Sequence, residues 1–170
     1  GVSAQVLNQQ EQSLLHLIIK NNLQLGGNKA AQQTIRQQLV ATLIGQGLNL
    51  NARDMNGRSA LHYALEGKQW DWVDPLLNAG INPNIQSNIE EYALSLALKL
   101  FNQPGTEAKD LSLIKKLLAH QADPNQRDSL GETCLFAAYR SKQPELIQLL
   151  LDHGANPAIR SYYGQVAGQN

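Results

Sequence analysis

The sequence predicts an all-α solenoid, built from about four stacked helix-turn-helix repeats with turn or hairpin tips. The first observation is a loop phrase that recurs every 33 or 41 residues: GLNLN at 47–51, GINPNI at 80–85, QADPN at 121–125 and GANPA at 154–158. The second is an apolar segment before every copy, and the third is a polar turn and another apolar segment after the first three copies. One such unit cannot bury its apolar face alone, so neighbouring units must share an elongated core.

The segment before each loop phrase is predicted to be a helix with one apolar face, because leucine or isoleucine pairs lie three and four residues before the Gly or Gln. These segments are 39–46, 72–79, 113–120 and 146–153. The glycine that follows suits a helix end at which a left-handed residue closes the last turn. Gln121 takes that place in the third copy and should cost about 1 kcal/mol there.

The segment after each loop phrase begins with a tight turn and continues as a shorter helix. RDMNG at 53–57 leads into 59–65, QSNIE at 86–90 into 92–98, and RDSLG at 127–131 into 133–139. Ser59 and Thr133 are suitable helix N-caps. Asp and Gly favour tight turns, and they occur here as Asp54, Gly57, Asp128 and Gly131.

DMNGRSALHYAL with LLNAGINPN, and DSLGETCLFAA with LLLDHGANP, resemble the ankyrin repeat, whose pattern is roughly D-x-x-G-x-T-P-L-H-x-A and then L-L-x-x-G-A-x-x-N. The resemblance implies an ankyrin-repeat solenoid that forms a single domain over residues 1–170. Its approximate repeats are 8–51, 52–84, 85–125 and 126–158, and residues 159–170 resemble the start of a truncated or capping repeat. The third repeat is divergent, with Tyr92, Ala93, Leu94 and Ser95 in place of T-P-L-H.

Two repeats are longer than this pattern. The extra residues are expected between the two helices of a repeat, near 21–33 in the first copy and near 101–110 in the third, where a loop lengthens at small cost. Pro75 lies within a predicted second helix and should bend it or shift its start. Trp70 and Trp72 begin that helix, and at least one of them should be buried.

Composition argues against several classes of partner. The formal net charge is zero and no stretch concentrates Lys or Arg, which argues against nucleic acid. The longest apolar run, 14–19, is broken by His16 and is too short to cross a bilayer. The chain begins at Gly1, which leaves a removed signal peptide open. We expect a monomer without membrane insertion, located in the cytoplasm or delivered outside the producing cell.

No set of residues resembles a catalytic, cofactor or metal site, so the sequence predicts a protein that is not an enzyme. His16 and His62 share one repeat position, and each imidazole is expected to bond the backbone and its cap serine. His120 and His153 share another, at a helix end, where an imidazolium suits the helix dipole. Cys134, the single cysteine, replaces the proline of the ankyrin pattern and should be buried.

The resemblance implies that the turn tips and the exposed side of the first helices form a concave groove that binds another protein. Carried over to this chain, the tip residues would be Arg53, Met55, Asn56, Arg58, Gln86, Asn88, Ile89, Arg127, Ser129, Leu130, Arg160, Tyr162 and Tyr163. The first helices would add Glu66, Lys99 and Arg140. Apolar residues at tips gain nothing for folding, and rigid aromatic and arginine anchors are typical of interfaces. For Tyr162 and Tyr163, packing on a continuing repeat is the equal alternative.

Three hypotheses for function follow from these features. The first is a protein–protein interaction module. A more specific form is that the divergent, insertion-bearing, Gln-rich repeats resemble those of bacterial effectors or of proteins that neutralise a toxin. The third hypothesis is that the segment recruits substrates for, or targets, a larger enzyme.

Overall fold

The computed structural model describes residues 7–22, 25–103 and 111–169, so most of the insertion predicted near 101–110 lies outside the described residues. The predicted all-α fold is confirmed, since the only β pairing within the described ranges is a bridge between Arg160 and Val166. The elements are α1 (Leu14–Lys20), α2 (Lys29–Gly45), α3 (Ala60–Glu66), η1 (Trp70–Trp72), α4 (Val73–Asn78), α5 (Ala93–Phe101), α6 (Ser112–Ala119), α7 (Cys134–Arg140) and α8 (Pro144–Asp152). They fall into two compact units, Gly1–Asn88 and Ile89–Asn170.

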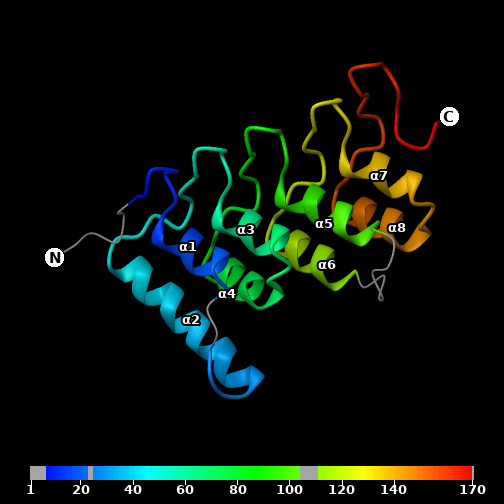
Figure 1. Cartoon of the computed structure of the whole chain (residues 1–170). Coiled ribbons are helices and arrows are strands. Elements are labelled where there is room, and N and C mark those ends of the chain that lie inside the picture. Colours follow the sequence, from blue (N-terminus) through cyan, green and yellow to red (C-terminus); the bar gives the residue numbers. More distant parts are fainter. Residues whose placement is uncertain (1–6, 23–24, 104–110, 170) are drawn as a thin grey trace. The chain divides into compact units, whose positions relative to one another are not determined.

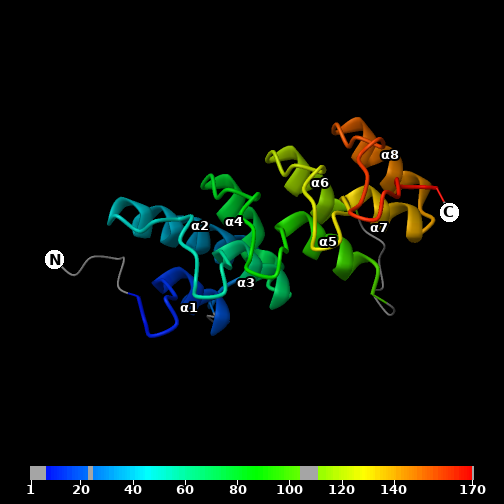
Figure 2. The ribbon, with the colours of Figure 1, turned by 90° about the horizontal axis from the view of Figure 1, so that it is seen from above.

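In the first unit, the first helices of the two repeats pack together, as do the second helices. Figure 1 and Figure 2 show α1 beside α3, with α2 and α4 in a second layer. Leu15 and Ile19 of α1 and Leu61 and Leu65 of α3 are fully buried. The shared core is the cover that one repeat alone would lack.

The second unit is built in the same way. Helix α5 packs on α6 and α7, and α7 packs on α8 (Figure 2). Its fully buried side chains come from all four helices: Leu94, Leu98, Ile114, Leu117, Leu135 and Leu146. The i, i+3, i+4 leucines of the sequence therefore supply the core of each unit.

The end of each second helix follows the prediction. The residue after the C-cap is left-handed, with φ of 88° at Gly47, 86° at Gly80, 67° at Gln121 and 86° at Gly154. The next residue then donates its N–H back into the helix, as when Ile81 donates to the Leu76 carbonyl at 3.1 Å. This six-to-one bond closes the helix and turns the chain toward the next repeat.

The recurring loop phrase also ties neighbouring loops together. Oδ1 of Asn51 accepts a hydrogen bond from the N–H of Asn82 at 2.8 Å. In the second unit, Oδ1 of Asn125 accepts from the N–H of Asn156 at 2.7 Å, and its Nδ2 donates to the Gly154 carbonyl at 2.9 Å. Asparagine recurs with the repeat because one side chain satisfies the backbone of the adjacent loop.

The first repeat differs from the prediction in the length of its second helix. Helix α2 begins at Lys29, so the last part of the predicted insertion 21–33 is helical and not loop. Asn28 caps this helix by accepting the Ala31 N–H at 2.9 Å, and the following KAAQQ consists of strong helix formers. The earlier start was missed because the apolar period of the sequence begins only near residue 39.

The second repeat has a short second helix, and the predicted effect of Pro75 is confirmed. A 3₁₀ turn over Trp70–Trp72 precedes α4, which places Pro75 at the third helical position, where its missing N–H costs no helical bond. Trp72 is buried at 1% exposure while Trp70 is 46% exposed. The guanidinium of Arg36 on α2 lies over the Trp72 ring, 5.6 Å from its centre, and joins the two second helices.

Candidate functional site: hairpin tips and first helices

The tips are hairpin turns, and in four of them a polar side chain at the second position holds the turn. Oδ1 of Asp54 accepts hydrogen bonds from the N–H groups of Asn56 at 2.9 Å and Arg58 at 2.8 Å. The same pair of bonds recurs at three equivalent positions: Asn8, Asp128 and Ser161. The sequence predicted a tight-turn role for the two aspartates, and Asn8 and Ser161 show that the oxygen of a neutral amide or hydroxyl serves as well.

The fifth position of the tips is left-handed. Its φ is 73° at Gly57 and Gly131 and 77° at Gly164, and Glu90 adopts 58° in the third tip, which lacks glycine. At Gly57 and Gly131, a close neighbouring atom also leaves no room for a side chain. A Cβ on Gly57 would lie 2.9 Å from the backbone nitrogen of Asn88, and one on Gly131 would lie 2.7 Å from that of Tyr162.

Neighbouring tips within a unit are joined by backbone hydrogen bonds. The N–H of Met55 donates to the Gln10 carbonyl at 3.1 Å, and the N–H of Asn88 donates to the Asn56 carbonyl at 2.8 Å. In the second unit, the N–H of Tyr162 donates to Leu130 at 3.0 Å. The side chain of Asn88 adds a further bond between tips, because its Nδ2 donates to the Met55 carbonyl at 2.9 Å. The backbone bonds themselves use no side chain, which is compatible with the exposure of Met55, Leu130 and Tyr162.

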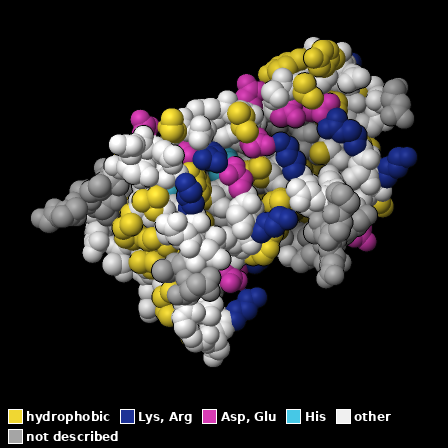
Figure 3. Space-filling model, in the orientation of Figure 1, with side chains coloured by type: hydrophobic (Ala, Val, Ile, Leu, Met, Phe, Trp, Pro, Cys, Tyr) yellow, Lys and Arg dark blue, Asp and Glu magenta, His cyan; other side chains and the backbone are white. Residues whose placement is uncertain are grey.

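Most of the predicted tip residues are exposed. The large apolar side chains retain much of their surface, at 56% for Met55, 70% for Ile89, 44% for Leu130, 66% for Tyr162 and 77% for Tyr163. Hydrophobic atoms gather over the last hairpin at the upper right of Figure 3. The polar tip residues Arg53, Asn56, Asn88, Ser129, Arg127 and Arg160 are exposed as well, whereas Gln86 is half-buried. Their role in binding stays a prediction.

Three of these arginines occupy one repeat position. Arg53 donates through Nε to the Gly57 carbonyl at 3.1 Å, and Arg160 donates to the Gly164 carbonyl at 2.7 Å. The guanidinium of Arg127 lies over the ring of Tyr162, 5.9 Å from its centre. Each arginine therefore braces a tip while its charge faces solvent.

The predicted charged residues of the first helices form ion pairs within their own repeats. Arg58 pairs with Glu66 at 3.1 Å, Lys99 with Glu91, and Arg140 with Glu132 at 2.6 Å. Figure 3 shows basic and acidic side chains next to one another on this face of each unit. The sequence contained the signal, because opposite charges recur eight residues apart, from just before the N-cap to the end of the first helix.

The second repeat adds a buried network around Asp54. The carboxylate accepts from the guanidinium of Arg58 at 3.0 Å and from the hydroxyl of Tyr63 at 2.8 Å. Burial by itself would raise the pKa of Asp54, but the hydrogen bonds from Arg58 and Tyr63 outweigh it and leave the pKa below its ordinary value. Burial and the Asp54 carboxylate raise the pKa of Tyr63, so this hydroxyl remains a donor at neutral pH.

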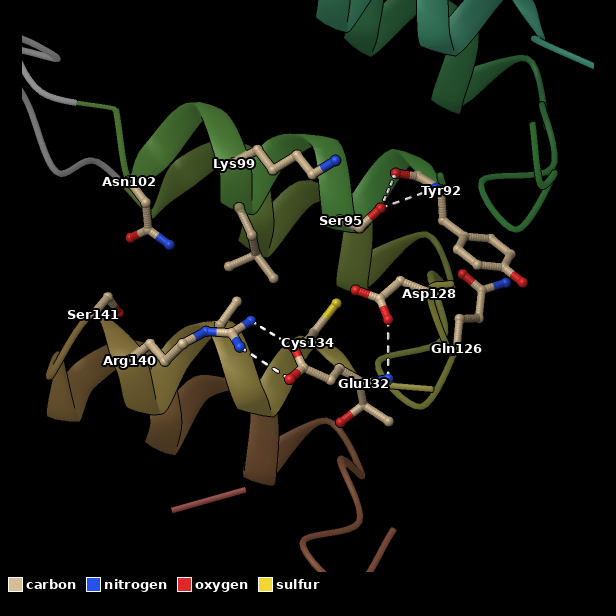
Figure 4. Close-up of a pocket in the computed structure, with 13 residues that line it drawn as sticks. Tyr92, Ser95, Lys99, Asn102, Gln126, Asp128, Glu132, Cys134, Arg140 and Ser141 are labelled. Atoms are coloured by element: carbon tan, nitrogen blue, oxygen red, sulfur yellow. Dashed lines mark hydrogen bonds and ion pairs between the residues drawn. The ribbon is translucent and has the colours of Figure 1, made fainter. Parts of the chain in front are cut away.

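The second unit contains an open hollow of about 520 Å³ between α5 and α7. Figure 4 shows Lys99 and Asn102 from α5 and Arg140 and Ser141 from α7 at one end. The opposite end is formed by Tyr92, Gln126 and Asp128, and the carboxylate of Glu132 lies at the guanidinium of Arg140. The uncharged small and aliphatic residues of the lining, Leu98, Cys134 and Ala137, are called its floor here. The sequence predicts Lys99 and Arg140 as partner-binding residues but does not predict the hollow. Its floor depends on which small residues face one another across two helices.

The first unit has a polar hollow at the corresponding place. It encloses about 450 Å³ and is lined by residues that include Asp54, Arg58, Tyr63 and Glu66. Tyr63 and Ala137 occupy the same position of the repeat, four residues after Ser59 and Thr133 respectively. The larger and more polar Tyr63 therefore lines the hollow of the first unit where the small Ala137 lines that of the second.

The comparisons with known proteins agree with this geometry. The family described as "Ankyrin repeats (3 copies)" matches residues 105–167, and "Ankyrin repeat" matches residues 56–88. The chain belongs to the ankyrin repeat family. Among solved structures, the ankyrin repeat domain of Bcl-3, a member of the IkappaB protein family, matches with a TM-score of 0.73 at 21% identity, covering 98% of this chain and 66% of that one. This likeness shows the ankyrin fold.

The ankyrin relatives come from different kinds of organism. The ankyrin repeat protein YahD of Escherichia coli is 29% identical over 157 residues, which cover 74% of this chain and 78% of YahD. An ankyrin repeat protein of Fowlpox virus is 36% identical, covering 68% of this chain and 33% of its own length. An L-asparaginase of Dirofilaria immitis is 29% identical, covering 71% of this chain. This chain spans only 25% of that enzyme.

The histidines of this ankyrin chain have structural roles. Nδ1 of His16 accepts from the N–H of Ser13 at 3.0 Å, and its Nε2 donates to the Arg58 carbonyl at 3.1 Å, which joins two repeats. His120 and His153 each donate through Nδ1 to a carbonyl of the last helical turn, at 2.9 and 2.8 Å. No group of three or more metal-ligating side chains occurs within residues 7–22, 25–103 and 111–169. Ankyrin repeats are generally protein-interaction modules.

Two further features bear on chemistry and location. Cys134 is buried, as predicted, and burial raises the pKa of its thiol to about 12. Such a thiol stays protonated and is a poor nucleophile. Among the described helices, none has the length and apolar character needed to span a membrane.

Proposed function

We propose that this ankyrin chain is a non-enzymatic protein–protein interaction module whose partner binds the hairpin tips and the first helices. The observation that carries the proposal is the exposure of Met55, Ile89, Leu130, Tyr162 and Tyr163 on tips whose backbone is bonded to neighbouring residues. Burial of such side chains against a partner would be favourable, and a rigid tip loses little conformational entropy on binding.

The arginines add charge to these anchors. Arg53, Arg127 and Arg160 are exposed, and within the described ranges no carboxylate lies within ion-pair distance of their guanidinium groups. Their cationic faces favour a partner with acidic groups. In the proposal, the arginines position the partner and the apolar tip side chains supply most of the affinity.

The test has two stages. Affinity capture with mass spectrometry, from a host lysate and separately from the lysate of the producing cell, identifies the partner and separates an effector from an inhibitor of a resident toxin. The variant R53E/R127E/R160E should then abolish binding to that partner with little change in thermal melting. Unaltered affinity would contradict the proposal.

Two matched variants guard against misreading a folding defect. Arg53 and Arg160 brace their tips, so charge reversal also removes two hydrogen bonds. R53Q/R127Q/R160Q removes the charge and keeps an amide donor, and glutamine is the residue that the third tip itself carries, as Gln86. K29E/K115E/K116E changes the net charge as much as the glutamate variant does, on α2 and α6, and should bind normally.

A second candidate is that the segment recruits substrates for a larger enzyme. The match to an L-asparaginase, of which this chain spans 25%, favours it. The complete reading frame tests this candidate: a catalytic domain before or after these residues would support it, and its absence would remove it.

Location in the cytoplasm, delivery to a host and a monomeric state also belong to the proposed function. Fractionation tests the location, and light scattering tests the monomeric state.

A further inference from the structure

We propose that the hollow between α5 and α7 receives an apolar side chain from a partner segment that carries a carboxylate next to it. The inference rests on the proposed function and gives the chemical class of the partner. It depends on three properties of the second unit: an uncharged floor, an outward positive charge at one end, and an alanine where the first unit has a tyrosine.

The floor of the hollow suits an apolar group. Leu98 and Cys134 are buried there and Ala137 is half-buried, and these small or aliphatic side chains leave about 520 Å³ above them. The thiol of Cys134 is protonated, because its pKa is about 12. Figure 4 shows its sulfur pointing from α7 into the space between the two helices. A leucine-sized side chain would therefore meet neutral surface.

The charges at the rim are paired but unequally exposed. Arg140 has 63% of its side chain exposed while its partner Glu132 has 10%, and Lys99 has 64% exposed while Glu91 has 16%. The carboxylates thus lie beneath, and the cations face solvent with N–H groups to spare, since Arg140 uses two of its five on Glu132. This end of the hollow presents positive charge to a ligand.

The opposite end carries one carboxylate, on Asp128, and so differs in charge from the exposed rim at Lys99 and Arg140. Oδ1 of Asp128 already accepts two backbone N–H groups, at 2.9 and 3.0 Å, so this carboxylate is engaged in holding its own tip. An acidic segment placed with its carboxylate at Lys99 and Arg140 and an apolar neighbour over Ala137 would match both properties. A basic segment would meet like charges at the exposed rim.

The second repeat suggests substitutions that would replace the small Ala137 and reverse the outward charge of the rim. Ala137→Tyr introduces the residue found at the same position as Tyr63, whose hydroxyl donates to Asp54 at 2.8 Å; Asp128 occupies the equivalent place. The exchange E132R/R140E reproduces the polarity of the Arg58–Glu66 pair. It preserves both the ion pair and the net charge, while the outward charge becomes negative.

The experiment uses a random twelve-residue phage-displayed peptide library panned on the full chain. Enriched peptides are synthesised with a fluorescent label and titrated by anisotropy. We expect sequences with Leu, Ile, Met or Phe within about three residues of Asp or Glu. Filling the hollow in A137Y, or reversing the rim in E132R/R140E, should weaken binding at least about tenfold. The control K115E on α6 should bind within about twofold of the unchanged chain.

Circular dichroism verifies that each variant is folded, and A137L replaces A137Y if the tyrosine prevents folding. Enrichment of peptides without carboxylates, full affinity of the filled variant, or failure to enrich any peptide would each overturn the inference. If the natural partner is lost by R53E/R127E/R160E but binds A137Y normally, the proposed function stands and only the assignment of the hollow falls.

Discussion

The glycine at the fifth position of a tip allows a prediction with an internal control. Gly131 and Gly164 have nearly the same backbone, with φ of 73° and 77°. They differ in their surroundings, because a Cβ on Gly131 would lie 2.7 Å from the backbone nitrogen of Tyr162, whereas nothing lies within 4 Å of one on Gly164. G131A and G164A therefore share the cost of a left-handed alanine and differ in the contact with the next tip.

The magnitudes follow from these distances. Alanine in a left-handed conformation costs about 1–2 kcal/mol, and this is the whole loss expected for G164A. G131A must also move the neighbouring tip to reach ordinary contact, an overpacking cost of about 1–3 kcal/mol. It weakens the bond from Tyr162 N–H to the Leu130 carbonyl, which is worth about 0.5–1.5 kcal/mol. We expect G131A to be less stable than G164A by at least about 1.5 kcal/mol.

Two measurements check this difference. Urea unfolding followed by circular dichroism gives the free energy of unfolding of each variant, and amide hydrogen exchange reports the Tyr162 N–H directly. Exchange at Tyr162 should be faster in G131A and unchanged in G164A. Equal destabilisation, or a Tyr162 amide that stays protected in G131A, would refute the idea that neighbouring tips are bonded into a row.

Two other predictions concern buried titratable groups. Burial lowers the pKa of His16, although the bond to the Arg58 carbonyl opposes this effect. The unfolded chain therefore binds this proton more readily, and the free energy of unfolding should fall as pH drops below about 6.5 toward the folded pKa. H16Q should lose this part of the pH dependence, and an unchanged slope would contradict the assignment. Cys134, with a pKa of about 12, should resist a disulfide reagent at pH 8 in the folded chain and react in urea, and rapid reaction without urea would show that the thiol is accessible.

Features that recur in every repeat were predictable because each repeat carries the same local sequence pattern. The left-handed position after each second helix was placed correctly even at Gln121, where glycine is absent. Ser59 occupies the N-cap of α3 as expected and forms a capping box with His62. Thr133 occupies the N-cap of α7, but its hydroxyl makes no capping hydrogen bond there. These features depend on residues within one turn of each other, so the pattern suffices.

Features that lack an apolar period, or that depend on two repeats, were not predictable in the same way. The start of α2 at Lys29 was not predicted, because the first turns of this helix carry no apolar period. The eight-residue spacing of opposite charges indicates the pairs of Lys99 with Glu91 and of Arg140 with Glu132, but the hollow between α5 and α7 required coordinates. At one repeat position of the lining, the first unit has Tyr63 and the second has Ala137.

The sequence by itself determined the repeat, its two helices, the loop that closes it and the residues that reach the tips, because local propensity and apolar periodicity act over short distances along the chain. Tertiary structure alone decided which glycines are close to a neighbouring tip and where a ligand-sized space remains. These depend on side chains from different repeats, about 30–40 residues apart, whose distances are set by packing and not by spacing along the chain.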